Sequence, residues 1–268
     1  MSEAPDARRM HDANRVAWDE AAVAYEGEVD ARVAFLRAGG TSFCPPERPF
    51  LRGVSGRVVH LQCAAGQDTL SFLGIGASEV VGIDISERMI ACAEATGRAL
   101  GARARWIRGD VLDAPADLDG TADWVYTGRG ALCWLMDLGA WAAVVARLLK
   151  PGGALYIFEG HPVAALFDTE ADEVRLDPDG GDYFRAEPLP SRGWPSTYVG
   201  DVLPGERSLK YERAWKLSDV VNAVVGAGLA LVRLEEHPEP FWNEFPRLPD
   251  EVRRRFPSTF SLLARRPG

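Results

Sequence analysis

Hydrophobic runs alternate with amphipathic segments along most of the chain. Short apolar runs bounded by turn residues predict strands at residues 57–62, 79–84, 103–108, 122–127 and 154–159. Helix-like segments lie between most of these runs. The clearest are residues 86–100, with Ser86 as the expected N-cap, and residues 137–153, which end on a Pro-Gly-Gly turn. Strands and helices that alternate at this spacing predict a parallel sheet with helices on both faces, and ligands are then expected at the carboxyl ends of the strands.

The two ends of the chain carry weaker patterns. Residues 11–38 place apolar positions among acids and arginines, which predicts one or two amphipathic helices before a Pro-punctuated break at 44–50. The C-terminal part predicts a further helix and two further strands, at residues 217–229, 229–236 and 258–265. We therefore expect an N-terminal helical cap over residues 1–50 and a larger domain over residues 51–268.

Residues 162–210 interrupt the alternation of strands and helices. They hold many Asp, Gly and Pro residues, show no convincing period, and include the aromatic residues Tyr183, Phe184, Trp194 and Tyr198. An insertion of this length without clear elements is often functional. We predict that it forms a lid or a substrate-binding insertion.

Composition and charge narrow the class of protein. The formal net charge is −9 and no long run of Lys and Arg occurs, so a nucleic-acid substrate is not expected. No stretch approaches about 20 apolar residues, and the N-terminus lacks a signal-peptide core, so neither a membrane span nor secretion is expected. The four cysteines and four histidines are isolated from one another. This spacing indicates a reduced, cytoplasmic protein without a structural metal.

Three features fall at the ends of successive predicted strands. The loop 63–69 follows the first strand and opens a helix, whose N-terminus can hold an anionic or polar group. Asp84 ends the second strand, where a carboxylate can accept hydrogen bonds from both hydroxyls of a ribose. Asp110 ends the third strand and is placed to accept a purine amine, beside the backbone of Val111. Together they predict an adenosine site. Taken singly, Asp84 could cap the next helix and Asp110 could form an Asx turn.

The order of these features resembles the class I S-adenosylmethionine (SAM)-dependent methyltransferases, clearly over residues 55–160 and more loosely elsewhere. The stretch 58–66, VVHLQCAAG, matches the first motif of that family, and LLKPGGALYIFE matches its Lys-Pro-Gly-Gly turn and fifth strand. The run from Trp18 to Tyr25 looks like the N-terminal helix that closes over SAM. The resemblance implies an α/β, Rossmann-like, doubly wound seven-stranded sheet with its last strand antiparallel. It also implies SAM as cofactor and S-adenosylhomocysteine (SAH) as product.

The first motif departs from the family pattern at three positions. His60 replaces the usual acid, and Gln62 and Ala64 replace glycines. Glycine is used there because a side chain would crowd a backbone that approaches the ligand. Ala64 takes little space, whereas Gln62 either points away or itself bonds the amino or carboxylate group of the methionine moiety. His60, inside an apolar strand, is expected to be a core histidine.

The predicted site residues form three groups. The resemblance places the following residues at the cofactor: Tyr25, Gln62, Cys63, Ala64, Gly66, Asp68, Thr69, Asp84, Ile85, Met89, Gly109, Asp110, Val111, Thr127 and Gly128. A general base is needed only for an acceptor that must lose a proton, and the candidates are His161, Glu159 and His237. The candidates for substrate binding are Trp18, Arg129, Trp134, Tyr198 and Trp242. Alternatively, His161 anchors the lid, Arg129 is an exposed arginine, and Phe241 and Trp242 form the core of the lid.

The sequence therefore predicts SAM-dependent O-, N- or C-methylation of a small organic molecule by a monomer or homodimer, with bacterial secondary metabolism as a hypothetical setting. One alternative is a SAM-binding enzyme of the same fold that catalyses a cyclisation or rearrangement. Another is a non-catalytic binding subunit. An NAD-dependent Rossmann enzyme is disfavoured because its glycine motif would fall on Gln62, Ala64 and Gln67.

Overall fold

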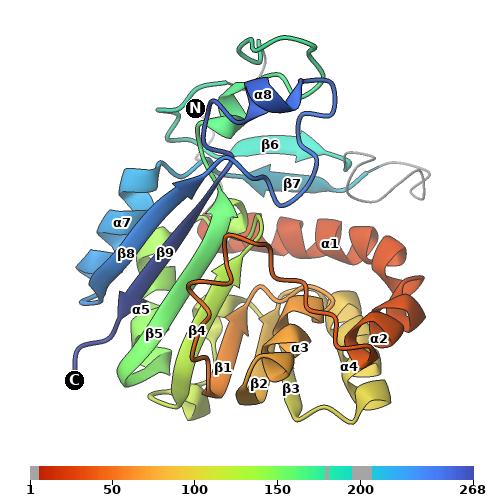
Figure 1. The fold of residues 1–268 in the computed structure, drawn as a ribbon, viewed down its shortest axis with the longest axis vertical. Coiled ribbons are helices and arrows are strands. Elements are labelled where there is room, and N and C mark those ends of the chain that lie inside the picture. The colour runs from red at the N-terminus through yellow and green to blue at the C-terminus, as the bar shows by residue number, and fades with distance from the viewer. Residues whose placement is uncertain (1–5, 179–180, 195–206) are drawn as a thin grey trace.

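The structure of the protein is a computed structural model, and it describes residues 6–178, 181–194 and 207–268. A seven-stranded sheet forms the centre of the protein (Figure 1). The strand order is β3-β2-β1-β4-β5-β9-β8. Strand β9 runs antiparallel to both of its neighbours, and the other pairs are parallel. The strands are β1 (Gly56–Leu61), β2 (Ala77–Asp84), β3 (Ala104–Arg108), β4 (Ala122–Gly128), β5 (Leu149–Gly160), β8 (Ala230–His237) and β9 (Thr259–Arg265). The predicted Rossmann-like fold is confirmed.

Alternate residues of the central strands point into two separate cores, as the period of a strand requires. Val59 packs with Trp141 of α5 and Val224 of α7, on one face of the sheet. Val58 packs with Leu70 of α3 and other residues on the opposite face. The principal helices around the sheet are α3 (Gln67–Gly74), α4 (Glu87–Leu100), α5 (Leu138–Leu148) and α7 (Leu217–Gly226). Short 3₁₀ helices lie at Val111–Asp113, Ala116–Leu118, Leu132–Trp134 and Ala164–Leu166.

The predicted helix boundaries hold at α4 and fail at the end of α5. Ser86 caps α4, because its hydroxyl accepts a hydrogen bond from the N–H of Met89 at 3.1 Å. Helix α5 ends at Leu148, and β5 begins at Leu149, ahead of the Pro-Gly-Gly turn. A proline disfavours the helical conformation for the residue before it, so the helix ends before Pro151 is reached.

The N-terminal region forms two helices, α1 (Ala7–Glu26) and α2 (Val29–Arg37), as the pattern predicts. Helix α1 crosses the carboxyl ends of the strands (Figure 1). It packs against α4 and against strand β7 (Leu209–Glu212). Helices α1 and α2 therefore lie over the edge of the sheet where a ligand is expected, although the division of the chain into two domains stays a prediction.

The insertion contains regular structure that the sequence pattern does not show. Strands β6 (Leu189–Arg192) and β7 (Leu209–Glu212) form an antiparallel two-stranded sheet. Asn14 of α1 holds β7 in place: its amide donates to the carbonyl of Tyr211 at 2.9 Å and accepts from the Tyr211 N–H at 2.7 Å. A short helix, α8 (Asp250–Arg253), also went unpredicted.

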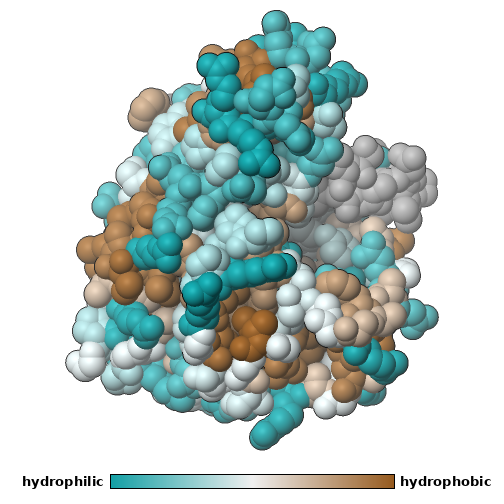
Figure 2. Space-filling model, in the orientation of Figure 1, coloured by the Kyte–Doolittle hydropathy of each residue, from teal (hydrophilic) through white to brown (hydrophobic). Residues whose placement is uncertain are grey.

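The surface shows an apolar area along the edge of the sheet, over α7 and β8, at the left of Figure 2. Val225, Leu231 and Val232 are 51%, 41% and 53% exposed there. Strand β8 is an edge strand, and an unpaired edge strand can pair with a strand of another molecule. The predicted oligomeric state, monomer or homodimer, stays a prediction. Within the described ranges, no helix has the length and apolar character needed to cross a membrane.

Candidate active site

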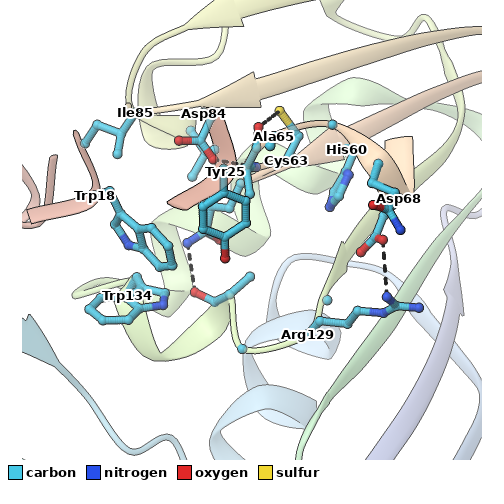
Figure 3. A pocket seen from close by; sticks show the side chains of 18 of the residues that line it. Trp18, Tyr25, His60, Cys63, Ala65, Asp68, Asp84, Ile85, Arg129 and Trp134 are labelled. Atoms are coloured by element: carbon cyan, nitrogen blue, oxygen red, sulfur yellow. Dashed lines mark hydrogen bonds and ion pairs between the residues drawn. The ribbon is translucent and has the colours of Figure 1, made fainter. Parts of the chain in front are cut away.

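A cavity of about 270 Å³ opens at the carboxyl ends of β1, β2 and β4, beneath α1 (Figure 3). Asp84 and Ile85 lie on one side of it, His60, Asp68 and Arg129 lie on the other, and Tyr25 lies between them. Its walls include many of the predicted cofactor residues: Tyr25, Gln62, Cys63, Ala64, Gly66, Asp68, Asp84, Ile85, Asp110, Val111 and Gly128. The strand-end features singled out in the sequence therefore share one cavity.

The loop after β1 has left-handed backbone conformation at three positions. The φ angles are +60° at Gln62, +45° at Ala64 and +79° at Gly66. A Cβ on Gly66 would lie 2.6 Å from the Trp106 ring and 2.7 Å from the Cβ of Ala93, so only glycine fits there. Gln62 and Ala64 adopt a conformation that glycine adopts without strain. Strain of this kind persists where the surrounding structure enforces it, often at ligand sites.

The Gln62 side chain has one partner and one vacant acceptor. Its Nε2 donates to the carbonyl of Ala131 at 2.8 Å. Its Oε1 is buried and accepts no hydrogen bond from the part of the chain that the structure describes. A buried amide oxygen without a donor is costly, so a donor on a ligand would be favourable here.

Asp84 is buried on the side of the cavity away from Arg129 (Figure 3). Its Oδ2 accepts from the N–H of Ala64 at 2.8 Å, and its Oδ1 accepts from the N–H of Ser86 at 2.9 Å. Burial raises the pKa of this carboxyl to about 6, although both backbone hydrogen bonds oppose the shift. Since Ser86 itself caps α4, the alternative role of Asp84 as helix cap is wrong. Each carboxylate oxygen retains a lone pair for a ligand.

Asp110 combines the predicted turn with an unexpected partner. Its Oδ1 accepts from the N–H of Leu112 at 2.9 Å, as an Asx turn requires. Its Oδ2 lies 2.6 Å from Nδ1 of His11 on α1. The N–H of Met136 donates to Nε2 of His11 at 3.0 Å, so Nδ1 carries the proton and donates to Asp110. His11 therefore links α1 to the end of β3.

Arg129 is held by two acidic residues. Its Nη1 lies 3.2 Å from Asp68, and its Nη2 lies 3.0 Å from the fully buried Glu47 and also contacts the carbonyl of Ser42. The guanidinium side chain is only 18% exposed, so the alternative of an exposed arginine is wrong. Arg129 lines the cavity as a fixed part of its wall.

His60 faces the same end of the cavity and is neutral. Its Nδ1 lies 2.8 Å from the hydroxyl of Thr69, and its Nε2 is buried without a partner among the described residues. Burial lowers the pKa of its imidazole to about 4. His60 is thus both a core histidine, as expected, and a cavity residue.

Arg32 of α2 is a further cavity residue that the sequence patterns do not single out. Its side chain is 3% exposed, and its Nε and Nη1 have no partner in the described ranges. Its Nη2 lies 3.5 Å from Glu28. A buried guanidinium with vacant donors is unfavourable unless an anion pairs with it. The part of the cavity beside Arg32 is therefore prepared for an anionic group.

Tryptophan rings close one side of the cavity. Trp18 lies 5.2 Å from Trp134 and 4.5 Å from Trp194, measured between ring centroids. Trp18 and Trp134 line the cavity, and Figure 3 shows them side by side. Their predicted role in substrate binding stays a prediction. The same rings form a small core between α1 and the insertion.

A second cavity, of about 370 Å³, adjoins the first and shares Gly130 and Trp242 with it. It lies beyond the end of β5 and contains Glu159 and His161. Glu159 accepts from the N–H groups of Gly130, Ala131 and Leu132 at 2.7, 2.8 and 3.1 Å. Burial nevertheless raises the pKa of its carboxyl to about 7. Three backbone donors fix Glu159 in place, so it supports the loop after β4.

The ring of His161 has a hydrogen bond at Nδ1, and its Nε2 lies at ion-pair distance from Glu236 without forming a hydrogen bond. The N–H of Val163 donates to Nδ1 at 3.2 Å, and Nε2 lies 2.8 Å from Glu236. Burial lowers the pKa of the ring, which leaves it neutral at pH 7. A neutral imidazole with its acceptor nitrogen occupied has no lone pair left for a proton from a substrate. The geometry favours the role of lid anchor over that of general base.

The comparisons with known proteins agree with this architecture. Residues 58–153 match a family model described as a methyltransferase domain. A S-adenosylmethionine-dependent methyltransferase from Mesorhizobium loti has a TM-score of 0.60 and 24% identity, with 85% of this chain and 99% of that chain covered. The fold is that of a class I methyltransferase. The comparison with curated proteins gave no match.

Two other structures of this methyltransferase fold have different chemistry in their names. One is a geranyl diphosphate C-methyltransferase from Streptomyces coelicolor, in complex with SAH, with a TM-score of 0.55, 16% identity, and 82% of this chain and 77% of that chain covered. The other is the [4+2]-cyclase SpnF, with a TM-score of 0.52, 17% identity, and 79% and 74% covered. At these identities the likeness shows the fold alone.

Several of the predicted site residues do not line either cavity. The residues predicted at the cofactor that do not line the first cavity are Thr69, Met89, Gly109 and Thr127. Thr69 still bonds His60, which does line it. His237 lines neither of these two cavities, and its Nε2 bonds Ser261 at 2.9 Å. Tyr198 lies outside the described residues. No group of three or more His, Cys, Asp or Glu in the described chain is arranged to hold a metal ion.

Proposed function

We propose that this protein transfers a methyl group from SAM to a small organic acceptor bound in the second cavity. The observation that carries the proposal is the polarity of the first cavity. Its walls hold the carboxylates of Asp84 and Asp110, the vacant buried donors of Arg32 and the vacant buried acceptor of Gln62. SAM has a matching set of groups: adenine, ribose diol, and a zwitterionic amino acid tail.

The adenosine part would bind beside Asp84 and Asp110. The Asp84 carboxylate would accept hydrogen bonds from the ribose hydroxyls, and Asp110, with the Val111 backbone, would hold the adenine. Ile85 lines the wall between them. His11 keeps Asp110 oriented through its 2.6 Å contact, so this end of the site is preorganised.

The amino acid tail would bind beside Arg32 and Gln62. The vacant Nε and Nη1 of Arg32 suit the carboxylate, and the vacant Oε1 of Gln62 suits the ammonium group. The bound sulfonium supplies an activated methyl group. Methyl transfer then depends chiefly on the orientation of the acceptor, which the walls shared by the two cavities would provide.

A labelling experiment tests the proposed reaction. The protein is incubated with methyl-labelled SAM and a mixed panel of small amines, phenols and carboxylic acids, and labelled product and SAH are quantified. We expect equal amounts of labelled product and SAH. An acceptor converted without release of SAH would instead favour a cyclisation or rearrangement, for which the fold shared with a [4+2]-cyclase gives a precedent. Failure to bind SAM would contradict both.

The affinity for SAH should depend on pH through Asp84. Its carboxyl has a pKa of about 6 in the free protein, and ribose hydroxyls favour its ionised form. Binding therefore requires loss of a proton below pH 6, so the affinity should be constant above pH 7 and fall by up to about tenfold per pH unit below 6. Titration calorimetry from pH 5 to 8 measures this. In Asp84→Asn the decline should be absent, and an equal decline would assign it to another group.

Gln62→Gly tests the variant motif. Glycine relieves the strain at φ +60°, worth about 1–2 kcal/mol, and loses the hydrogen bond to Ala131, worth about 1 kcal/mol. The free energy of unfolding should therefore change by no more than about 1 kcal/mol, whereas SAH affinity should fall about fivefold or more because the ammonium loses its acceptor. Denaturant melts and calorimetry measure the two quantities. Unchanged affinity would show that Gln62 serves the backbone alone.

A further inference from the structure

The second cavity has aromatic walls. Trp215, Phe241, Phe245 and Phe260 line it, together with Trp242 at the boundary with the first cavity. Its volume of about 370 Å³ lies in the range of small-molecule sites. Aromatic faces attract cations as well as apolar groups, so these walls suit an organic cation.

The carboxyl groups in these walls differ in their hydrogen-bond and ion-pair partners. Glu159 faces three backbone N–H groups. Glu212 accepts from the ammonium of Lys210 at 2.9 Å. Glu244 forms a side-chain hydrogen bond with Trp242, whose indole can only donate, and no charged neighbour among the described residues influences its pKa. Among the described residues, Glu244 is therefore the wall carboxyl with neither a cationic partner nor a set of backbone N–H donors.

The cationic residue in the wall is directed away from this carboxyl. Arg213 stacks on Trp215, with 3.9 Å between its guanidinium carbon and the ring centroid. Its Nη1 donates to the carbonyl of Met136 at 3.2 Å. Met136 lines a separate shallow cavity and not this one. His161 is neutral, as shown above. The second cavity thus presents aromatic rings and an uncompensated carboxyl group.

We propose that the acceptor is an amine, which enters as an ammonium ion and pairs with Glu244. This inference rests on the proposed function. Glu244 accepts one proton from the ammonium and becomes a carboxylic acid. The nitrogen lone pair then forms a bond to the methyl carbon of SAM, and the carbon–sulfur bond breaks with its electron pair left on sulfur. The products are a methylated ammonium ion and neutral SAH, and Glu244 afterwards returns its proton to solvent.

The environment of Glu244 suits this proton transfer. Burial raises the pKa of its carboxyl to about 7, and the hydrogen bond from Trp242 opposes the shift. A group with a pKa near the working pH is an efficient general base. The indole of Trp242, which also lines the first cavity, holds Glu244 beside the boundary between the two cavities.

Binding measurements on SAH-loaded, full-length protein test the inference. The probes are two amines, phenethylamine and tryptamine, and two matched compounds, 2-phenylethanol and 3-phenylpropionate. We expect both amines to bind at least about tenfold more tightly than the neutral and acidic compounds. Glu244→Gln, which preserves the shape of the side chain, should weaken amine binding about tenfold or more and leave SAH affinity unchanged. Glu251→Gln, at an exposed position in α8, is the matched control and should change neither.

Three results would overturn the inference: no binding by either amine, tighter binding of the alcohol or the acid, or an unaltered amine affinity in Glu244→Gln. In each of these three cases the wild-type protein would still bind SAH. If the proposed function itself is wrong, the wild-type protein would not bind SAH. Methylation of phenols or acids alone in the labelling experiment would keep the function and reject the amine.

Discussion

Arg32→Met should weaken SAH binding roughly 10- to 100-fold without lowering the stability of the ligand-free protein. The guanidinium is buried with two vacant nitrogens, so it is a cost to the free protein and a partner for the carboxylate of the ligand. A lost charge-assisted hydrogen bond is worth about 1.5–3 kcal/mol, which corresponds to this loss of affinity. Methionine is unbranched and fills the same space without a charge.

Calorimetry with SAH and thermal melts of the free protein measure the two effects. Arg37→Met is the control, because Arg37 lies on the same helix, outside the cavity walls. A fall in both affinity and stability would indicate that Arg32 has a structural role. Unaltered affinity in a folded variant would remove Arg32 from the site.

Asp84→Ala should weaken SAH binding by about 10-fold to several hundred-fold. The variant loses the acceptor for the ribose hydroxyls, and the N–H groups of Ala64 and Ser86 lose theirs. The first effect acts on the ligand and the second loosens the strained loop 62–66, so both reduce affinity. Asp117→Ala, which removes an exposed acid paired with Arg105, is the control and should bind SAH normally. A folded Asp84→Ala protein with wild-type affinity would refute the ribose assignment.

The sheet could be predicted because its strands obey simple periodicities. In β1, Val58 and Val59 point to opposite cores, and both cores are apolar, so the strand reads as a continuous hydrophobic run. The hairpin β6–β7 could not be predicted in this way. It is short and partly exposed, and its position depends on contacts from α1, such as that of Asn14, more than 190 residues away in sequence.

The residues of the candidate site likewise fall into two groups, those that the sequence predicts and those that it does not. Asp84 and Asp110 could be found because parallel strands bring their ends to one edge of the sheet, so position along the chain determines position in space. Arg32, His11 and Glu244 could not be found. They lie on segments whose approach to the cavity depends on tertiary packing, and single charged residues on such segments usually face solvent. The signal they carry, burial without a full set of partners, exists only in the folded protein.

Gln62 shows how the structure completes what the sequence indicates at one position. The sequence marks it as a departure from a glycine position and leaves its direction open. The structure shows that the backbone keeps the left-handed conformation of a glycine, with φ +60°, and that the side-chain oxygen is buried without a donor. The altered residue thus retains the loop conformation, and it adds a polar atom where the ammonium group of SAM would bind.

In the proposed complex, the first cavity binds SAM with its adenosine toward Asp84 and its amino acid tail toward Arg32. Calorimetric titration of wild-type protein with SAH, with adenosine and with homocysteine tests this most directly. We predict one SAH per chain, weaker binding of adenosine that is lost in Asp84→Ala but retained in Arg32→Met, and tight binding of SAH only when both residues are present. No binding of SAH to the wild-type protein, or equal loss of adenosine binding in both variants, would contradict this placement of SAM.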